Sequence, residues 1–294
     1  MNILVMGGTG YLGSKMCRAL VNEGHRVVAT RRNTSDLSRT IDINDKVKWI
    51  DASVNSIVSE NTVNKFDFAI NMICNYGKAD ILYDSVIDAN LVFPLKVFNA
   101  LVSGGVKRFL TIGTGLPSDF NMYSFSKELL AEGGRFFVDK HNISFYNVKL
   151  EMFYGSDEPE NRFLPSVIKR MIHGQSVKTT VGKQKRDIIA VDDVIDVLVR
   201  LVMLHPNGYY DIPLGTGIAP SISEVIDYIW NKTGCKADVQ KGAVPMRPDE
   251  PDCVANTELL KSFFLDWEPV SWKEGIDRMI LEIKKQEVCN ETIN

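Results

Sequence analysis

A glycine-rich loop directly after a short apolar run at the start of the chain constrains the fold most strongly. Residues 3–6 (Ile-Leu-Val-Met) are predicted to form a buried strand, and residues 14–22 the helix that follows. Between them, Gly7, Gly10 and Gly13 recur at every third position. This spacing allows a tight turn and a close approach of the backbone to a pyrophosphate, while the helix N-terminus attracts the anion. The segment predicts dinucleotide binding; the alternative is a plain strand-to-helix turn.

The end of the second predicted strand indicates which dinucleotide binds. A carboxylate there holds the ribose hydroxyls of NAD(H), whereas a cation suits the 2′-phosphate of NADP(H). The run from His25 to Asn33 has no acid at its end and carries Arg31 and Arg32, whose guanidinium groups stay charged and grip phosphate through two donors. The pair predicts NADP(H); the alternative is that the two arginines form a solvated turn.

Composition excludes several classes of protein. Of the 294 residues, 45% are hydrophobic and 24% charged, which is typical of a globular chain with a sizeable core. A net charge of -3 gives no basic excess for nucleic acid, and no apolar run approaches the roughly 20 residues of a membrane helix. We expect a cytoplasmic protein that binds neither nucleic acid nor membrane, since no signal peptide precedes the first strand. The five cysteines and four histidines lack paired spacing, which predicts neither a disulfide nor a metal site.

Strands and helices alternate regularly over the first 150 residues. Further strands are predicted after the second one, with helices between them, at 47–51, 66–73, 108–112 and 144–150. This repeat predicts an α/β fold with a doubly wound parallel sheet of the Rossmann type, whose ligand crevice lies at the carboxyl ends of the strands. A helix from about 84 to 103 should bend at Pro94.

Short elements separated by proline and glycine follow Leu150. They predict a smaller C-terminal α/β lobe over 151–294 that binds the substrate, after a cofactor-binding domain over 1–150. The strand and helix expected at 187–204 return to the first domain. The polar end at 286–294 is predicted to be disordered.

A tyrosine four residues before a lysine on a helix places both side chains on one face, where the ammonium can lower the phenol pKa from near 10 by about 1 to 3 pH units. The chain holds three such pairs: Tyr11 with Lys15, Tyr123 with Lys127, and Tyr228 with Lys232. Tyr11 lies in the phosphate loop, and Tyr228 lies on a helix with ordinary core spacing. Tyr123 opens the helix after a central strand, so it is the predicted acid–base residue.

Taken in order, these motifs resemble those of the extended short-chain dehydrogenase/reductase family, over residues 1 to about 280. Besides the glycine loop and the Tyr123–Lys127 pair, Asn90 and Thr114 stand where the family carries its asparagine and its active-site Ser or Thr. The resemblance implies that Tyr123 transfers the proton, that Lys127 lowers its pKa and binds the nicotinamide ribose, and that Thr114 hydrogen-bonds the substrate oxygen. Thr114 and Tyr123 are nine residues apart, fewer than is usual, so the loop should be trimmed and Thr114 could be displaced.

The C-terminal half resembles the members of the family that bind nucleotide sugars. A diphosphate needs cations that stay charged, although each arginine could equally form a surface salt bridge. The implied substrate-binding residues are Tyr76, Asn90, Asn161, Arg162, Phe163, Arg186 and Arg247. The predicted cofactor-binding residues are Gly7, Thr9, Gly10, Tyr11, Leu12, Gly13, Arg31, Arg32, Asp51 and Lys127.

The residues after Thr114 discriminate among the reactions of such enzymes. Dehydratases usually place an Asp-Glu pair there, whereas this chain has Gly115 and Leu116. Epimerases keep bound NAD, whereas Arg31 and Arg32 suggest an exchangeable NADPH. The likeness is strongest to nucleotide-sugar 4-ketoreductases of the CDP-abequose and CDP-paratose synthase type, including Asn75 to Lys78.

The resemblance implies reduction of the C4 keto group of an NDP-4-keto-6-deoxyhexose by NADPH, in deoxysugar and O-antigen polysaccharide biosynthesis. The expected partners are a nucleotide sugar and a second copy of the chain in a homodimer. An NDP-sugar epimerase and, less favoured, a dehydratase remain alternatives. A catalytically silent NADP-sensing protein would need the glycine loop but not the tyrosine pair.

Overall fold

The chain folds into two compact units in a computed structural model that describes residues 1–77, 82–234, 236 and 238–293. The first unit comprises Met1–Leu150 and Ile195–Ile212, and the second comprises Glu151–Val194 and Pro213–Asn294. Residues 187–204 were expected to return to the first domain. The segment that returns is Ile195–Ile212. Residues 188–190 pair with a strand of the second unit, whereas the strand that begins at Tyr209 extends the sheet of the first.

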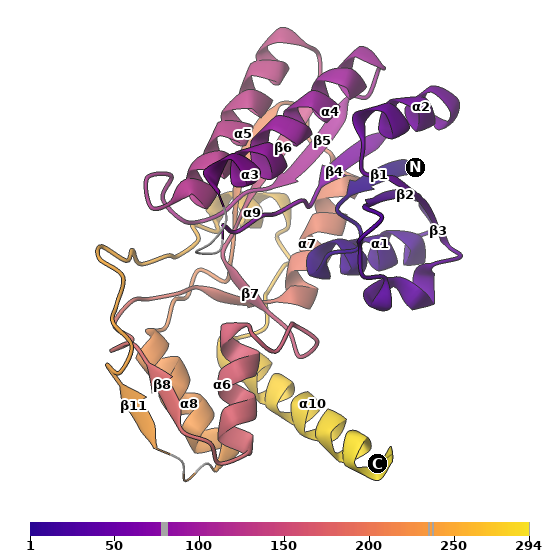
Figure 1. Ribbon diagram of the computed structural model, residues 1–294. Helices are drawn as coiled ribbons and strands as arrows, with labels where there is room; N and C mark the ends of the chain where they lie inside the picture. Colours follow the sequence, from indigo (N-terminus) through magenta and orange to yellow (C-terminus); the bar gives the residue numbers. More distant parts are fainter. Residues whose placement is uncertain (78–81, 235, 237, 294) are drawn as a thin grey trace. The chain divides into compact units, whose positions relative to one another are not determined.

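The first unit is built on a seven-stranded sheet in the order β10-β6-β5-β4-β1-β2-β3 (Figure 1). Its strands are β1 (Asn2–Met6), β2 (Arg26–Arg31), β3 (Val47–Asp51), β4 (Phe68–Asn71), β5 (Arg108–Ile112), β6 (Ser144–Leu150) and β10 (Tyr209–Leu214). Neighbouring strands from β3 to β6 pair in parallel, so the predicted doubly wound sheet is confirmed. Met6 and Asn71 pair at the ends of β1 and β4, where the strand order reverses and ligand crevices form in such folds.

Helices cover both faces of this sheet. They are α1 (Tyr11–Asn22), the 3₁₀ helix η1 (Ser38–Ile43), α2 (Val54–Asn64), α3 (Tyr83–Ile87), the π-helical turn η2 (Asp88–Val92), α4 (Phe93–Ser103), α5 (Met122–Lys140) and α7 (Val191–Leu204). Helices α2, α4 and α5 lie on one face, and α1 and α7 lie on the other (Figure 1). Buried Ile57, Val97 and Leu130 from α2, α4 and α5 share one core.

The helical stretch Tyr83–Ser103, where a bend at Pro94 was expected, changes its hydrogen-bonding pattern at Asp88–Val92, just before Pro94. The structure places Pro94 in the first turn of α4, directly after the π-helical turn η2, because proline cannot donate to the carbonyl four residues earlier. By length and composition this stretch could cross a membrane, with a mean hydropathy of 1.4, contrary to the expectation that no such run exists. About 33% of its apolar window is buried, and Val97, Phe98 and Leu101 lie fully buried in the core of the first unit.

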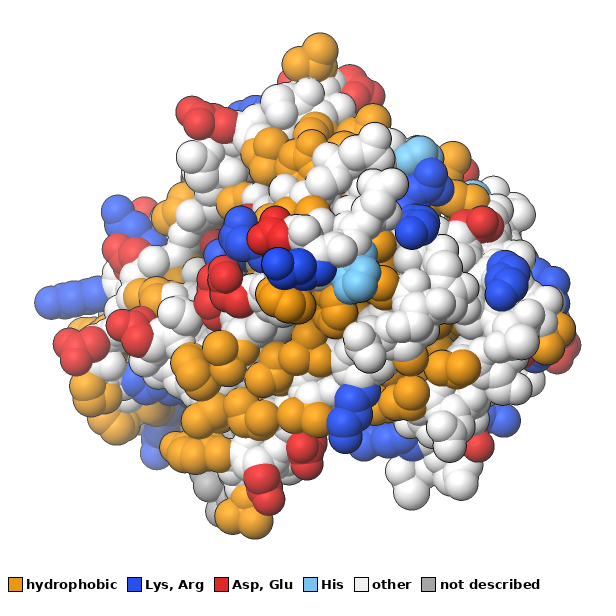
Figure 2. Space-filling view, turned by 90° about the horizontal axis from the view of Figure 1, so that it is seen from above, with side chains coloured by type: hydrophobic (Ala, Val, Ile, Leu, Met, Phe, Trp, Pro, Cys, Tyr) orange, Lys and Arg blue, Asp and Glu red, His pale blue; other side chains and the backbone are white. Residues whose placement is uncertain are grey.

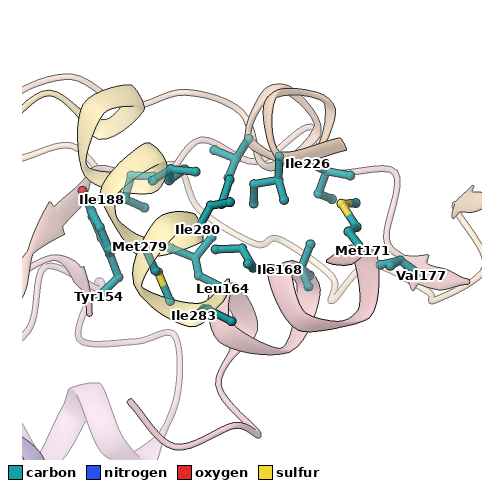
Figure 3. Close-up of a cluster of buried hydrophobic side chains, with 14 of the residues drawn as sticks. Tyr154, Leu164, Ile168, Met171, Val177, Ile188, Ile226, Met279, Ile280 and Ile283 are labelled. Carbon is teal, nitrogen blue, oxygen red and sulfur yellow. The ribbon is translucent and has the colours of Figure 1, made fainter. Parts of the chain in front are cut away.

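The second unit combines short strand pairs with a helical core. Its elements are β7 (Met152–Tyr154) paired with β9 (Ile188–Ala190), β8 (Val177–Thr179) paired with β11 (Val239–Lys241), α6 (Phe163–Ile172), α8 (Ile222–Thr233), α9 (Glu258–Phe263) and α10 (Trp272–Ile293). Ile168 of α6, Ile226 of α8 and Ile280 of α10 belong to one buried cluster (Figure 3). The helix α10 extends to Ile293, and its lysine, glutamate and glutamine residues favour helix.

Candidate active site

The glycine loop turns tightly between β1 and α1. Gly7 has a φ of +80°, in the left-handed region that favours glycine. A Cβ on Gly13 would lie 2.1 Å from the Gly7 carbonyl oxygen, so the turn and the first turn of α1 can pack together only without side chains there. Gly10 is the N-cap of α1, and the Ser14 N–H makes the first helical bond to its carbonyl at 2.8 Å. The N–H groups before Ser14 are those that a helix N-terminus offers to an anion.

A shallow, open depression of about 550 Å³, called the β2–β3 cavity below, lies between the ends of β2 and β3 and the helix α2. Arg31 and Asp51, both predicted to bind the cofactor, pair in register on these strands and line the cavity. Arg32 is exposed and is not among the described lining residues; its N–H donates to Ser35 Oγ at 3.0 Å. Trp49 also lines the cavity and was missed, although an aromatic residue on the strand beside Arg31 was a usable signal. Of the two adjacent arginines, the structure brings one to the cavity.

The start of α5 sets the position of the predicted catalytic tyrosine. Asn121 caps the helix, because its Oδ1 accepts the Ser124 N–H at 2.8 Å while Ser124 Oγ accepts the Asn121 N–H at 3.2 Å. Tyr123 therefore stands in the first turn. Thr114, in the loop after β5, hydrogen-bonds the Tyr123 phenol despite the short spacing. The structure thus brings Thr114 and Tyr123 together.

Lys127, one turn after Tyr123, is 3% exposed. Its Nζ donates to the Ile73 carbonyl at 3.0 Å and lies 6.0 Å from the centroid of the Tyr123 ring. Burial lowers the Lys127 pKa, whereas burial, followed by Cys74 and Tyr76, raises the pKa of Tyr123 well above its usual value. That Lys127 lowers the Tyr123 pKa stays a prediction; the structure holds the ammonium at a backbone carbonyl beside the ring.

Asn90 supports the loop after β4 rather than facing a ligand. It is fully buried, and its Oδ1 accepts the Asn75 N–H at 2.8 Å while its Nδ2 donates to the Asn75 carbonyl at 2.8 Å and to Ser126 Oγ at 3.0 Å. Its predicted role in binding substrate is thus corrected to a structural one. Tyr76, the next residue after Asn75, is half exposed, and its ring centroid lies 5.1 Å from that of Tyr123. Lys78, noted in the sequence, lies outside the described residues.

Cys74 is a residue of this site that sequence reasoning missed. Its thiol is exposed, and it hydrogen-bonds the Tyr123 phenol. Cys17 and Cys253 are also free thiols but are buried; Cys235 lies outside the described residues. Among the described residues, no group of three histidine, cysteine or acidic side chains could hold a metal.

The two other Tyr-Lys pairs have different surroundings. Tyr228 Oη donates to Asp277 at 3.0 Å and Lys232 Nζ to the same carboxylate at 2.7 Å, so this pair forms a surface ion-pair network in the second unit. The Lys15 Nζ lies 5.3 Å from the centroid of the Tyr11 ring, next to the glycine loop.

The predicted diphosphate-binding arginines of the second unit differ in their surroundings. Arg162, between Asn161 and Phe163, is the N-cap of α6 and pairs with Glu158 at 3.3 Å. Arg186 is 12% exposed at its side chain; its Nη2 pairs with Glu250 at 2.6 Å and its Nη1 donates to the Lys185 and Pro251 carbonyls. Arg247 is exposed in the segment between β11 and α9.

Residues 3–211 match the family described as "NAD dependent epimerase/dehydratase family". The CDP-abequose synthases of Salmonella muenchen and Salmonella typhimurium are 26% and 28% identical, each over 95% of this chain and over 96% and 97% of their own lengths. A UDP-glucose 4-epimerase of Lactobacillus helveticus is 23% identical over 95% of both chains.

Solved structures share the fold. The UDP-glucose 4-epimerase of Thermotoga maritima superposes with a TM-score of 0.83, at 19% identity, covering 98% of this chain and 100% of its own. The UDP-glucuronic acid 4-epimerase of Bacillus cereus, determined with UDP-glucuronic acid and NAD, gives a TM-score of 0.82 at 20% identity, covering 97% and 100%.

Proposed function

The chain belongs to the NAD dependent epimerase/dehydratase family, and we propose that it reduces the C4 keto group of an NDP-4-keto-6-deoxyhexose with NADPH. The observation that carries the proposal is the convergence of Tyr123, Thr114 and Lys127 at the carboxyl-terminal side of the sheet that also bears the glycine loop. The similarity to CDP-abequose synthases over almost the whole chain supports the substrate class.

The residues present fit a nicotinamide dinucleotide. The contact between Gly13 and the Gly7 carbonyl leaves no room for side chains at the turn, which is the arrangement a pyrophosphate needs. Arg31 would hold a 2′-phosphate at the β2–β3 cavity, beside Asp51 and Trp49, and favours NADP(H) over NAD(H). When bound, the cofactor supplies the hydride. Lys127 would hold the nicotinamide ribose.

The acid–base chemistry falls to Tyr123. The hydroxyl of Thr114 donates to the phenol oxygen, and in the proposed reaction it would also orient the substrate oxygen. As negative charge develops on that oxygen, the phenol donates its proton, a contribution of about 10² to 10⁴ in rate. Burial raises the pKa of Tyr123, and the phenol carries the proton that a reductase donates.

The second unit would bind the nucleotide. Arg162 and Arg247, with Asn161 and Phe163, are proposed to contact the diphosphate and base. Arg186 is also proposed, although a diphosphate must compete there with the Glu250 carboxylate. The protein would act in the cytoplasm, in the biosynthesis of deoxysugars for polysaccharides.

We also propose a homodimer formed through α5. Phe125, Leu129 and Phe136 are exposed, and positions four and eleven residues apart fall on one stripe of a helix. Figure 2, seen from above the view of Figure 1, shows hydrophobic side chains gathered on the side where α4 and α5 lie. A second copy would cover this stripe.

The decisive experiment is NADPH oxidation with CDP-, dTDP- and GDP-linked 4-keto-6-deoxyhexoses, with NADH as the cofactor control. Turnover with one nucleotide and with NADPH supports the proposal. Interconversion of a UDP-sugar with its C4 epimer, without net NADPH oxidation, would instead support the epimerase. Binding of NADPH without any turnover would support a silent NADP-sensing protein.

A further inference from the structure

The backbone of Ile73, just after β4, contacts both the glycine turn and Lys127. Its carbonyl accepts a hydrogen bond from the Lys127 ammonium at 3.0 Å. A Cβ placed on Gly7 would lie 3.2 Å from the Ile73 nitrogen and 3.2 Å from the Met72 carbonyl carbon, so the glycine turn packs closely against this backbone. One short segment therefore borders the turn proposed to receive the pyrophosphate and the ammonium proposed to bind the nicotinamide ribose.

A buried asparagine fixes this segment from the end of the preceding strand. Asn71, the last residue of β4, is fully buried, and its Oδ1 accepts the Ile73 N–H at 3.2 Å. A side-chain oxygen that accepts the N–H two residues later closes an Asx turn, which restricts the backbone between them. Asn71 pairs in register with Met6, the residue directly before Gly7. The Asx turn thus lies where the strand order of the sheet reverses.

Asn71 is held in turn by the next strand of the sheet. Its Nδ2 donates to the Oγ1 of Thr111 at 3.1 Å, and Thr111 is a buried residue of β5 that pairs with Asn71 in register. Leaving a buried donor or acceptor without a partner is costly, so the two bonds of the amide together select one orientation of the side chain. A series of three hydrogen bonds therefore connects Thr111, through Asn71 and Ile73, to the ammonium of Lys127.

We propose that Asn71 and Thr111 are positioning residues, which fix the Ile73 carbonyl and through it the place of the Lys127 ammonium. Both side chains are buried within the sheet, so they act on the site through Ile73. The inference rests on the proposed function for its purpose, since Lys127 is proposed to hold the nicotinamide ribose. A lysine already held in place loses less conformational freedom when the cofactor binds, and this raises the affinity.

The test follows Lys127 by NMR of protein labelled with ¹³C at the lysine Cε, with its signal assigned by loss in Lys127→Met. Thr111→Val removes the hydroxyl and keeps the shape of the side chain, and Asn71→Ala removes both amide bonds. Each should move the Lys127 signal, because the Ile73 carbonyl is no longer fixed. Thr111→Ser keeps the acceptor and should leave the signal in place. The matched control is Thr40→Val, which removes another buried threonine hydroxyl of the first unit and should also leave it in place.

The affinity for NADPH then shows whether the effect passes through the lysine. Thr111→Val should weaken NADPH binding about 3- to 10-fold, the effect of one hydrogen bond. In the Lys127→Met background the same change should have no further effect, because the group that it positions is already gone. A merely structural role would instead add its loss to that of Lys127→Met. Thr111→Ser should bind NADPH as tightly as the wild type.

An unmoved Lys127 signal in both Thr111→Val and Asn71→Ala, with native circular dichroism, would overturn the inference. Equal effects of Thr111→Val on NADPH affinity with and without Lys127 would overturn it as well. The two Thr111 variants give the comparison should Asn71→Ala fail to fold. Since the NMR measurement needs neither cofactor nor substrate, a moved signal without NADPH oxidation by any keto-sugar nucleotide would refute the proposed reaction alone, and an unmoved signal in active enzyme would refute this inference alone.

Discussion

The buried ammonium of Lys127 donates a hydrogen bond to the backbone carbonyl of Ile73 at 3.0 Å. A lysine on the second turn of α5 is thereby anchored to the loop that follows β4. The bond holds the ammonium 6.0 Å from the centre of the Tyr123 ring.

Replacing Lys127 by methionine should weaken NADPH binding about 10- to 100-fold, because a charged hydrogen-bond donor to the ribose is lost. Fluorescence titration with NADPH measures this directly. Lys232→Met is the matched control, since that lysine belongs to a surface ion pair with Asp277. Equal affinities in the wild type and Lys127→Met would remove Lys127 from the cofactor site.

Tyr123→Phe should lower kcat by about 10² to 10⁴ with little change in the KM for NADPH, because the ring is kept and only the acid is lost. The assay is NADPH oxidation with the preferred keto-sugar nucleotide. Tyr228→Phe, which changes the tyrosine of the Tyr228–Lys232 pair on α8, should keep wild-type activity. Near-normal turnover by Tyr123→Phe would rule out its role as the proton donor.

Arg31→Ala should reduce NADPH affinity about tenfold or more while leaving NADH affinity nearly unchanged, because the guanidinium lines the cavity proposed for the 2′-phosphate. Arg32→Ala, at an exposed position outside the described lining, should change neither. Isothermal titration with both cofactors checks the pair. Equal losses for NADPH and NADH would show that Arg31 does not read the 2′-phosphate.

Glu151, in the second unit, should make stability fall as the pH rises toward neutrality. Burial and the nearby Asp187 raise its pKa from 4.5 to about 7, against the opposing effect of Arg186. The folded state therefore binds the proton more tightly than the unfolded chain, and this stabilisation, complete below pH 4.5, is lost as the pH rises through about 7.

Glu151→Gln should thus be more stable than the wild type at pH 8, by about 2 kcal/mol, and similar at pH 4.5. Urea denaturation at both pH values measures the free energy of unfolding, with the exposed Glu282→Gln as the control. A wild type that gains stability between pH 5 and 8 relative to Glu151→Gln would contradict the prediction.

A combined Leu129→Glu and Phe136→Glu variant should be monomeric, because two carboxylates on the exposed stripe of α5 would be desolvated in a dimer. Light scattering after size-exclusion chromatography gives the mass. Val63→Glu, at an exposed apolar position on α2, should remain dimeric. A wild type that is already monomeric at micromolar concentration would refute the homodimer.

The parallel sheet and the glycine turn could be predicted because they depend on local patterns. Apolar runs of strand length, separated by helical segments, define the order of elements. Glycine is needed where the backbone packs against itself as closely as Gly13 packs against Gly7. Pro94 likewise marked an irregular helix, although the π-helical turn before it was beyond sequence reasoning.

The roles of the side chains at the site depend on contacts between residues that are far apart in the sequence. Asn90 was expected to bind substrate, yet it is fully buried on Asn75, because the π-helical turn η2 directs it to the loop after β4. Arg186 carries the charge that a diphosphate needs, but its pairing with Glu250, 64 residues later, is visible only in the fold. Cys74 had no motif around it, and its contact with Tyr123 joins residues from a strand end and a distant helix.

The sequence by itself determined the fold class, the phosphate-binding turn and the three possible Tyr-Lys pairs, since each follows from residues that are neighbours along the chain. Tertiary structure alone decided which pair is buried beside Thr114, and in which direction the Tyr123 pKa moves. The physical reason is desolvation: the spacing of Tyr123 and Lys127 can be read from the sequence, but the burial of both side chains, and the Ile73 carbonyl that holds the ammonium, arise only when strands and helices pack together.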